Sequence, residues 1–330
     1  MKKRFLFAGL SGFAVAAVAA KLLARPKDVE WTRHRETVFH SDYSRFAVVN
    51  GLRIHYQEAG DADAPPLLLI HGFASSTLVW SKVLLELADS GFRVIAADLA
   101  GYGYSSKPRD LDYTIGSQAQ MLVGLLDELK IPSADVVGSS YGAAVAASMA
   151  LDYSDRVERL VMVGAVTNNA PTRYMLMRLF KSPVIGDIVS PLLIGSRRLL
   201  RRRMKRVYDR HAWSLDERRV EARHLPLRAK SAHRAIIRTV RRWDADRISR
   251  DAHLITQPVL ILWGDHDQEV PLQNGELLQQ EIPQSRLFVF RDCGHLPQEE
   301  YPLLFTELVS NFCLAKQEFE KVAAEEVALV

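Results

Sequence analysis

The sequence is poor in cysteine and contains no internal repeat or low-complexity tract. Its 330 residues include two cysteines, Cys293 and Cys313, and neither lies in a C-x-x-C pair or near a His-x-x-x-His pair. The cysteine pattern therefore argues against a metal site and against a framework of disulfides, and leaves one disulfide between the two cysteines open. No period of about 20 to 50 residues recurs, so a solenoid is not expected.

Neither sign of charge dominates the whole chain, which has 43 Lys or Arg and 39 Asp or Glu. The balance is uneven, however, because the stretch 167–250 holds 22 Lys or Arg and only 7 Asp or Glu. No motif that reads nucleic acid accompanies this basic stretch, so nucleic acid is not an expected partner.

Long apolar runs are absent except at the amino terminus, where residues 5–20 carry no charge and lie between basic residues 2–4 and Lys21. As a helix these sixteen residues reach about 24 Å, slightly less than the ~30 Å thickness of a hydrocarbon core. The side chain of Lys21 can snorkel and extend the span. Residues 1–27 are therefore predicted to be a single-pass membrane anchor. The alternative is a cleaved signal peptide on a secreted or periplasmic protein, because Ala17-Val18-Ala19 offers small residues at the cleavage spacing.

Beyond a charged linker at 28–45, short apolar runs alternate with segments of helical length, which predicts an α/β fold with a mostly parallel sheet and helices on both faces. A hairpin turn at Asn50-Gly51 opens the domain. The alternation lapses at 167–250, which we interpret as an inserted helical cap. The expected strands include 67–70, 94–97, 136–137, 160–163 and 259–262, and the expected helices 78–88, 115–129 and 143–151. The expected core is 46–166 with 251–317, followed by a tail at 318–330.

A possible nucleophile stands in Gly138-Ser139-Ser140-Tyr141-Gly142, directly between an apolar strand and a helix of small residues. A G-x-S-x-G sequence in this context is typical of a nucleophile elbow, in which the central side chain is exposed above the sheet. The spacing selects Ser140 and not Ser139.

A serine hydroxyl needs a nearby imidazole to accept its proton, and the imidazole needs an acid to hold its tautomer. Asp265 and Asp267 follow the strand 259–262, and His295 follows the strand-like run 287–290. Residues at the carboxyl ends of parallel strands share one edge of a sheet. The order Ser, Asp, His therefore predicts a triad with His295 as the base.

An oxyanion needs two aligned donors, which are usually backbone N–H groups. His71-Gly72-Phe73 follows the strand 67–70, so the expected donors are the N–H groups of Phe73 and of Tyr141. Gly101 and Gly103 resemble a phosphate-binding loop only superficially, and we interpret them as a structural turn because no ribose-binding acid accompanies them. No cofactor is expected.

Taken together, these motifs resemble the α/β-hydrolase superfamily over about 46–313. The resemblance places the nucleophile at Ser140, the base at His295 and the acid at Asp267 rather than Asp265. Serine at the elbow differs from haloalkane dehalogenases and epoxide hydrolases, which carry aspartate there. With its apolar amino terminus and basic cap, the chain is similar to membrane-anchored monoacylglycerol lipases and lysophospholipases. The resemblance implies an esterase or lipase that acts on a lipid or small-molecule ester. The alternatives are a carbon–carbon bond hydrolase of aromatic ring-cleavage products and a catalytically silent binding module.

Overall fold

The computed structural model of the chain describes residues 29–170, 175–208 and 215–314. The predicted anchor at 1–27 and the tail at 318–330 lie outside these residues. Within the described part of the chain, no helix is both long enough and apolar enough to cross a membrane.

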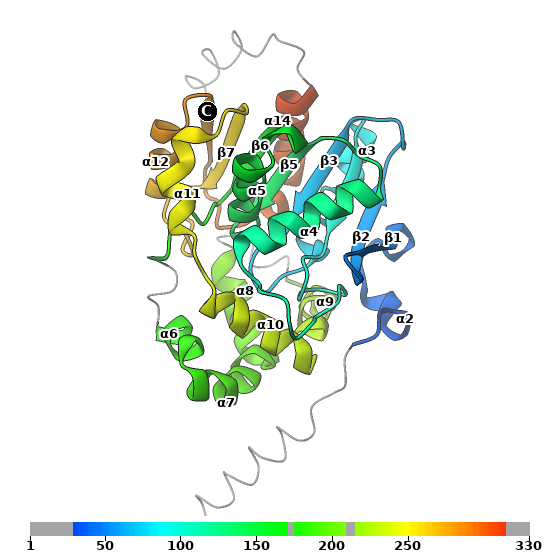
Figure 1. Ribbon diagram of the computed structural model, residues 1–330, viewed down its shortest axis with the longest axis vertical. Helices are drawn as coiled ribbons and strands as arrows, with labels where there is room; N and C mark the ends of the chain where they lie inside the picture. The colour runs from blue at the N-terminus through cyan, green and yellow to red at the C-terminus, as the bar shows by residue number, and fades with distance from the viewer. Residues whose placement is uncertain (1–28, 171–174, 209–214, 315–330) are drawn as a thin grey trace, which may run out of the picture.

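An eight-stranded sheet in the order β1-β2-β4-β3-β5-β6-β7-β8 forms the centre of the molecule (Figure 1). The pairs β1/β2 and β2/β4 are antiparallel, and from β4 to β8 every neighbouring pair is parallel. The predicted fold class is confirmed. The strands are β1 (Ser44–Val49), β2 (Leu52–Ala59), β3 (Pro66–Ile70), β4 (Arg93–Ala97), β5 (Ala134–Ser139), β6 (Val157–Val163), β7 (Val259–Gly264) and β8 (Ser285–Phe290).

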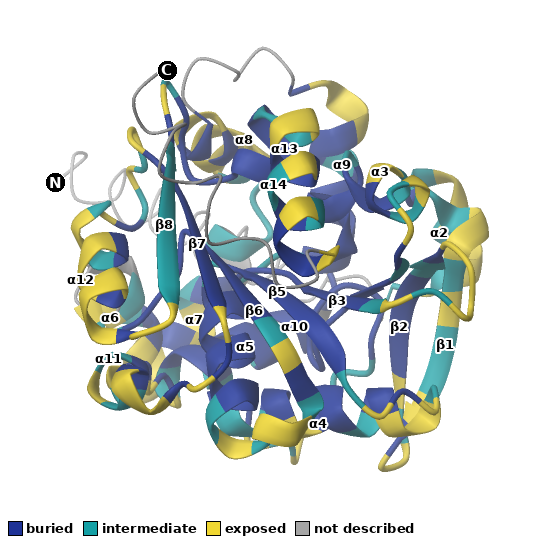
Figure 2. Ribbon diagram, turned by 90° about the horizontal axis from the view of Figure 1, so that it is seen from above, coloured by how far each residue is buried: buried dark blue, intermediate teal, exposed yellow. Residues whose placement is uncertain are grey.

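The central strands are largely apolar because helices cover both of their faces. Along β3, Leu68 and Ile70 point into one core, and Leu67 and Leu69 point into the other. Figure 2 shows these inner strands as buried, whereas the edge strands β1 and β8 are largely half-exposed. The first core contains α4 (Ile115–Glu128), α5 (Tyr141–Asp152), α11 (Asp246–Asp251) and α12 (Gln273–Glu281), and the second contains α3 (Leu84–Asp89) and α14 (Pro302–Leu314).

The stretch expected to be a linker is instead folded onto the domain where it is described. It contains α2 (Trp31–His34) and two short 3-10 turns, and it leads directly into β1. Phe39 lies beneath the guanidinium groups of Arg218 and Arg219, at 4.4 and 5.3 Å from the ring centroid, and Nε2 of His40 lies 2.7 Å from the carbonyl oxygen of Ser81. These contacts explain why a segment of mostly polar residues is ordered here.

Five helices lie between β6 and α11 in the described residues, in the stretch predicted to be a cap. They gather at one end of the molecule, beyond the carboxyl ends of the parallel strands (Figure 1). The segment α11 instead packs on α5, where Arg247 forms ion pairs with Asp152. The five are α6 (Met175–Lys181), α7 (Pro183–Ile194), α8 (Arg197–Val207), α9 (Glu217–Leu227) and α10 (Lys230–Arg241).

Candidate active site

The serine expected as nucleophile sits where β5 turns into α5. Ser140 has φ 58° and ψ −117°, a backbone conformation that residues other than glycine rarely adopt. Its flanking glycines let the backbones of strand and helix touch. A Cβ atom at Gly138 would lie 2.4 Å from the carbonyl oxygen of Gly142, and one at Gly142 would lie 2.3 Å from that of Ile70. The sharp turn therefore depends on both glycines.

The base and one of the two candidate acids come together across the next strands. Nδ1 of His295 lies 2.6 Å from Oδ2 of Asp267. The other carboxylate oxygen of Asp267 accepts the backbone N–H groups of Glu269 and Val270, at 2.8 and 2.9 Å. The structure does not bring Asp265 to His295, because Asp265 instead accepts the N–H of Cys293 at 3.2 Å.

The environment of His295 favours its protonated form, even though its side chain is buried. Burial lowers the pKa of His295, but the charge of Asp267 and the hydrogen bond to it outweigh this effect, so that the pKa is raised above its usual 6.5. An ionised Asp267 can only accept, so Nδ1 carries the proton and Nε2 of the neutral ring is left to accept one.

Two contacts bring the elbow and the His295 loop together. Gly164, just after β6, lies against the base and the acid. A Cβ atom there would be 3.0 Å from Nδ1 of His295. The residue before it, Val163, accepts the N–H of Ser140 at 2.8 Å. From the His295 loop, the amide of Gln298 donates to Oγ of Ser139 at 3.2 Å.

The loop expected to supply an oxyanion donor passes beside the elbow. A Cβ atom at Gly72 would lie 3.1 Å from Cβ of Ser140. Its neighbour His71 holds the loop, because Nε2 accepts the N–H of Leu99 at 3.0 Å and Nδ1 donates to the carbonyl oxygen of Gly72 at 2.8 Å. Burial lowers the pKa of His71 and keeps it neutral, as this pattern requires. The backbone of Phe73 therefore has a fixed position near the N-terminus of α5.

Behind this loop, the Gly101 to Gly103 turn wraps around a buried carboxylate and not a phosphate. Asp98 accepts the N–H groups of Thr77 and Tyr104, and lies 2.7 Å from Nδ1 of His55. Burial raises the pKa of Asp98, but the histidines and the backbone donors lower it to about 2. A Cβ atom at Gly103 would collide with this carboxylate, 2.0 Å from Oδ2. The turn is structural, as predicted.

Aromatic rings cover the elbow on the cap side. The ring of Trp243, which follows α10, lies 5.0 Å from that of Tyr141 and 5.5 Å from that of Phe73, measured between centroids. The hydroxyl of Tyr102 donates to Oγ1 of Thr239 in α10 at 2.7 Å. The cap is therefore packed directly on both residues expected to donate to an oxyanion.

A buried charged cluster beside the base was missed by the sequence reasoning. Glu299 is 1% exposed and is paired with Arg219 and Arg223 of α9. It lies in α13 (Pro297–Glu300), which begins two residues after His295. The run Pro297-Gln298-Glu299-Glu300 directly after the base was the available signal, but nothing in it shows that a carboxylate is buried.

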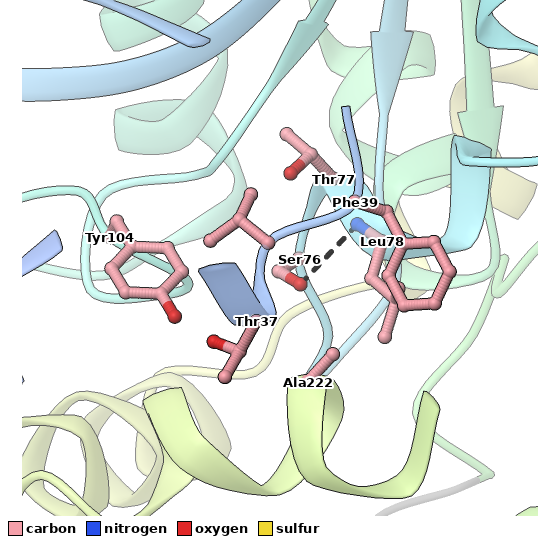
Figure 3. A pocket seen from close by; sticks show the side chains of 8 residues that line it. Thr37, Phe39, Ser76, Thr77, Leu78, Tyr104 and Ala222 are labelled. Atoms are coloured by element: carbon pink, nitrogen blue, oxygen red, sulfur yellow. Dashed lines mark hydrogen bonds between the residues drawn. The ribbon is translucent and has the colours of Figure 1, made fainter. Parts of the chain in front are cut away.

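A small pocket opens between the cap and the core (Figure 3). Its walls come from the amino-terminal segment, the loop after Phe73 and the cap helix α9, and Oγ of Ser76 accepts the N–H of Leu78 at 3.4 Å within it. The lining residues are Thr37, Val38, Phe39, Ser76, Thr77, Leu78, Tyr104 and Ala222.

Comparison with known proteins finds one matching family, described as the alpha/beta hydrolase fold, whose profile matches residues 65–184 and 208–302. A 2-hydroxymuconate semialdehyde hydrolase of Pseudomonas sp. strain CF600 is 32% identical over 278 residues, which are 82% of this chain and 94% of that relative. A meta-cleavage product hydrolase from Pseudomonas fluorescens IP01 is 26% identical, with a TM-score of 0.66 over 81% of this chain and 96% of its own. A membrane phospholipase A shares the fold at 24% identity, with a TM-score of 0.68 over 94% and 97% of the two chains.

Proposed function

Because this chain belongs to the α/β-hydrolase fold family, we propose that it hydrolyses carboxylic esters with Ser140 as nucleophile, His295 as base and Asp267 as the acid that orients the base. The single observation that carries the proposal is the 2.6 Å contact between Nδ1 of His295 and Oδ2 of Asp267. This pair lies against Gly164, and the preceding residue, Val163, accepts the backbone N–H of Ser140.

In the first half of the proposed reaction, Oγ of Ser140 attacks the ester carbonyl carbon while Nε2 of His295 takes the hydroxyl proton. The negative charge on the carbonyl oxygen is stabilised by the N–H groups of Phe73 and Tyr141. Tyr141 is the first residue of α5, and the N–H groups of a first helical turn have no partner within the helix. The carbon–oxygen bond to the alcohol then breaks, and His295 gives its proton to the departing alcohol.

In the second half, water replaces the alcohol. His295 takes a proton from the water, which attacks the acyl-enzyme carbonyl, and the carboxylic acid leaves as Ser140 regains its proton. The role of Asp267 is to keep the proton of the base on Nδ1 and to stabilise the imidazolium that forms in both halves. No metal or organic cofactor has a role in this scheme.

The substrate class follows from what surrounds the elbow. The rings of Phe73, Tyr141 and Trp243 pack together beside the elbow, beneath the cap. This apolar surrounding supports an ester with an apolar acyl group as the substrate. A lipid or small-molecule ester, such as a monoacylglycerol or a lysophospholipid, fits this description.

A second candidate is the hydrolysis of a carbon–carbon bond in a ring-cleavage product. It is supported by the 32% identity to a 2-hydroxymuconate semialdehyde hydrolase, which extends over 82% of this chain. The same serine, base and acid serve in either reaction, so these three groups do not distinguish the two candidates.

The test is hydrolysis of p-nitrophenyl esters from acetyl to palmitoyl, a monoacylglycerol, a lysophospholipid and a 2-hydroxy-6-oxo-dienoate, by the wild-type protein and by Ser140→Ala. We expect ester turnover that is lost in the variant, with a chain-length profile that separates esterase from lipase. Turnover of the dienoate alone would replace the ester proposal with the second candidate. Turnover of neither by folded protein would contradict both.

We also propose that residues 1–27 attach the enzyme to a membrane and that the basic cap faces anionic lipid. The support is the uncharged run at 5–20 together with Arg198, Arg202 and Lys205, which are exposed on α8. Cell fractionation of the full chain and of a variant lacking residues 1–27 tests this. We expect the full chain in the membrane fraction. A soluble product shortened by about the length of a signal peptide would instead support cleavage.

A further inference from the structure

A buried connection joins the cap to the loop that carries the base. We propose that Tyr208 and Glu299 form a latch that positions His295 against the cap, and that the chain therefore reaches full reactivity only with the cap docked. This inference rests on the function proposed above, because it assigns positioning residues to the same base.

One short piece of the cap makes two adjacent contacts with the His295 loop. The backbone N–H of His295 donates to the carbonyl oxygen of Val207, the last residue of α8, at 2.8 Å. The hydroxyl of the next residue, Tyr208, donates to Oε2 of Glu299 at 2.6 Å. Glu299 is four residues beyond His295, so the two contacts hold the loop on either side of the turn into α13.

Glu299 is itself held in place by buried charged groups. Its carboxylate is paired with Arg219 and Arg223, and its backbone carbonyl oxygen accepts Nζ of Lys82 at 2.6 Å. Burial raises the pKa of Glu299, but the two guanidinium charges outweigh this and leave it lowered, so the carboxylate stays ionised. A buried carboxylate in this setting cannot move without losing several charged contacts at once.

The same part of α8 also contacts the loop that carries the acid. Arg203 and Arg206 form ion pairs with Glu269 at 3.3 and 3.7 Å, and Glu269 lies two residues after Asp267. These two pairs involve exposed arginines and contribute little by themselves. They show that the end of α8 lies over both loops, so a shift of the cap would disturb the loop of the base and the loop of the acid.

The test measures how fast Ser140 is labelled by a fluorophosphonate probe, in which the serine oxygen displaces fluoride at phosphorus and the base takes the serine proton. Tyr208→Phe removes one hydroxyl and keeps the ring. We expect the labelling rate constant to fall roughly 10-fold to 100-fold, the range expected for small misplacement of a reacting group. For the best p-nitrophenyl ester, we expect a loss in kcat with little change in KM.

A matched control is Tyr113→Phe, which removes a tyrosine hydroxyl that donates to the carbonyl oxygen of Pro108 at 2.7 Å, away from the His295 loop. It is expected to keep the wild-type labelling rate. Each variant is assayed at a temperature at which its thermal unfolding curve shows it fully folded. In a Glu299→Leu background, which removes the acceptor of the Tyr208 hydroxyl, Tyr208→Phe is expected to have little further effect, because the two groups act as one unit.

The outcomes separate this inference from the proposed function. Absence of labelling in the wild-type protein would contradict both. Labelling of the wild type with an equal rate in Tyr208→Phe would overturn the latch and leave the serine hydrolase assignment intact. A rise in KM without a loss of kcat would also overturn it, because that pattern indicates a contact with substrate and not with the base.

Discussion

Adding one methyl group at Gly164 is expected to slow catalysis without replacing any of the three proposed catalytic side chains. In Gly164→Ala the new Cβ atom would lie 3.0 Å from Nδ1 and 3.1 Å from Cε1 of His295, and 3.3 Å from Oδ2 of Asp267. Carbon atoms in comfortable contact are about 3.5 to 4.0 Å from their neighbours. The imidazole therefore has to move by roughly 0.5 Å, which stretches or tilts its 2.6 Å contact with Asp267.

Two separate effects follow, and they can be measured separately. Gly164 has φ +51°, so alanine there adopts a left-handed conformation that costs roughly 1 to 2 kcal/mol of folding stability. Displacement of the base is expected to lower kcat by about 10-fold to 100-fold. Urea unfolding reports the first effect, and ester hydrolysis by the fully folded protein reports the second.

The control is Gly51→Ala in the β1–β2 hairpin. Gly51 has φ +76°, and nothing lies within 4 Å of the position that its Cβ atom would occupy. This variant is expected to lose a similar amount of stability and to keep the wild-type kcat. If Gly164→Ala retains kcat within twofold of Gly51→Ala, the imidazole tolerates the contact and the reasoning is wrong.

Three further outcomes are expected. His295 must be unprotonated to act as the base, and its pKa is raised, so kcat/KM for an ester should fall as pH falls, with a midpoint above 6.5. A pH–rate profile with a midpoint below 6.5 would contradict this account of His295. The ionised carboxylate of Asp98 stabilises the fold above its unfolded pKa of 3.8. About 2 kcal/mol of folding stability should therefore be lost as pH falls from about 4 to 2. Urea unfolding of Asp98→Asn should show a smaller loss of stability over the same pH range. Gly142→Ala places a Cβ atom 2.3 Å from the carbonyl oxygen of Ile70, so circular dichroism and fluorophosphonate labelling should show a protein that is unfolded or inactive.

The sheet and the elbow could be predicted because local sequence determines both. A strand covered on two faces needs apolar side chains in both directions, so β3 is a continuous apolar run and β5 has Val136 and Val137 at its centre. The hairpin could be predicted for the same reason. Asn50 and Gly51 both have positive φ, as a two-residue turn of this type requires. Ser140 was identified from the glycines two positions before and after it, which the structure explains by backbone contact.

The choice between Asp265 and Asp267 needed more than local sequence. Both follow β7 within three residues, and which carboxylate faces His295 depends on how the loop closes. The loop closes by hydrogen bonds from the backbone of Glu269 and Val270 to Asp267, and these cannot be read from residue types. The family resemblance supplied that choice at the sequence level.

The contacts between the cap and the rest of the chain could not be predicted at all. Phe39 looked like part of a charged linker because the residues that cover it, Arg218 and Arg219, are about 180 positions away. For the same reason no neighbour of Glu299 in the sequence indicates that it is buried against α9. Burial of a charge is decided by its partners, and here the partners come from a distant insertion.

The inserted cap is expected to decide which of the two candidate substrates the protein hydrolyses. A change at Ser140, His295 or Asp267 removes ester hydrolysis and carbon–carbon bond hydrolysis alike, since both proposals use these groups. The cap instead touches the base loop through Val207 and the oxyanion loop through Trp243. A cap that differs between two hydrolases of this fold can therefore change both the space above the nucleophile and the alignment of the groups that act on it. Substitutions in α8 and around Trp243 are expected to change the ratio of the two activities, which substitutions in the triad cannot do.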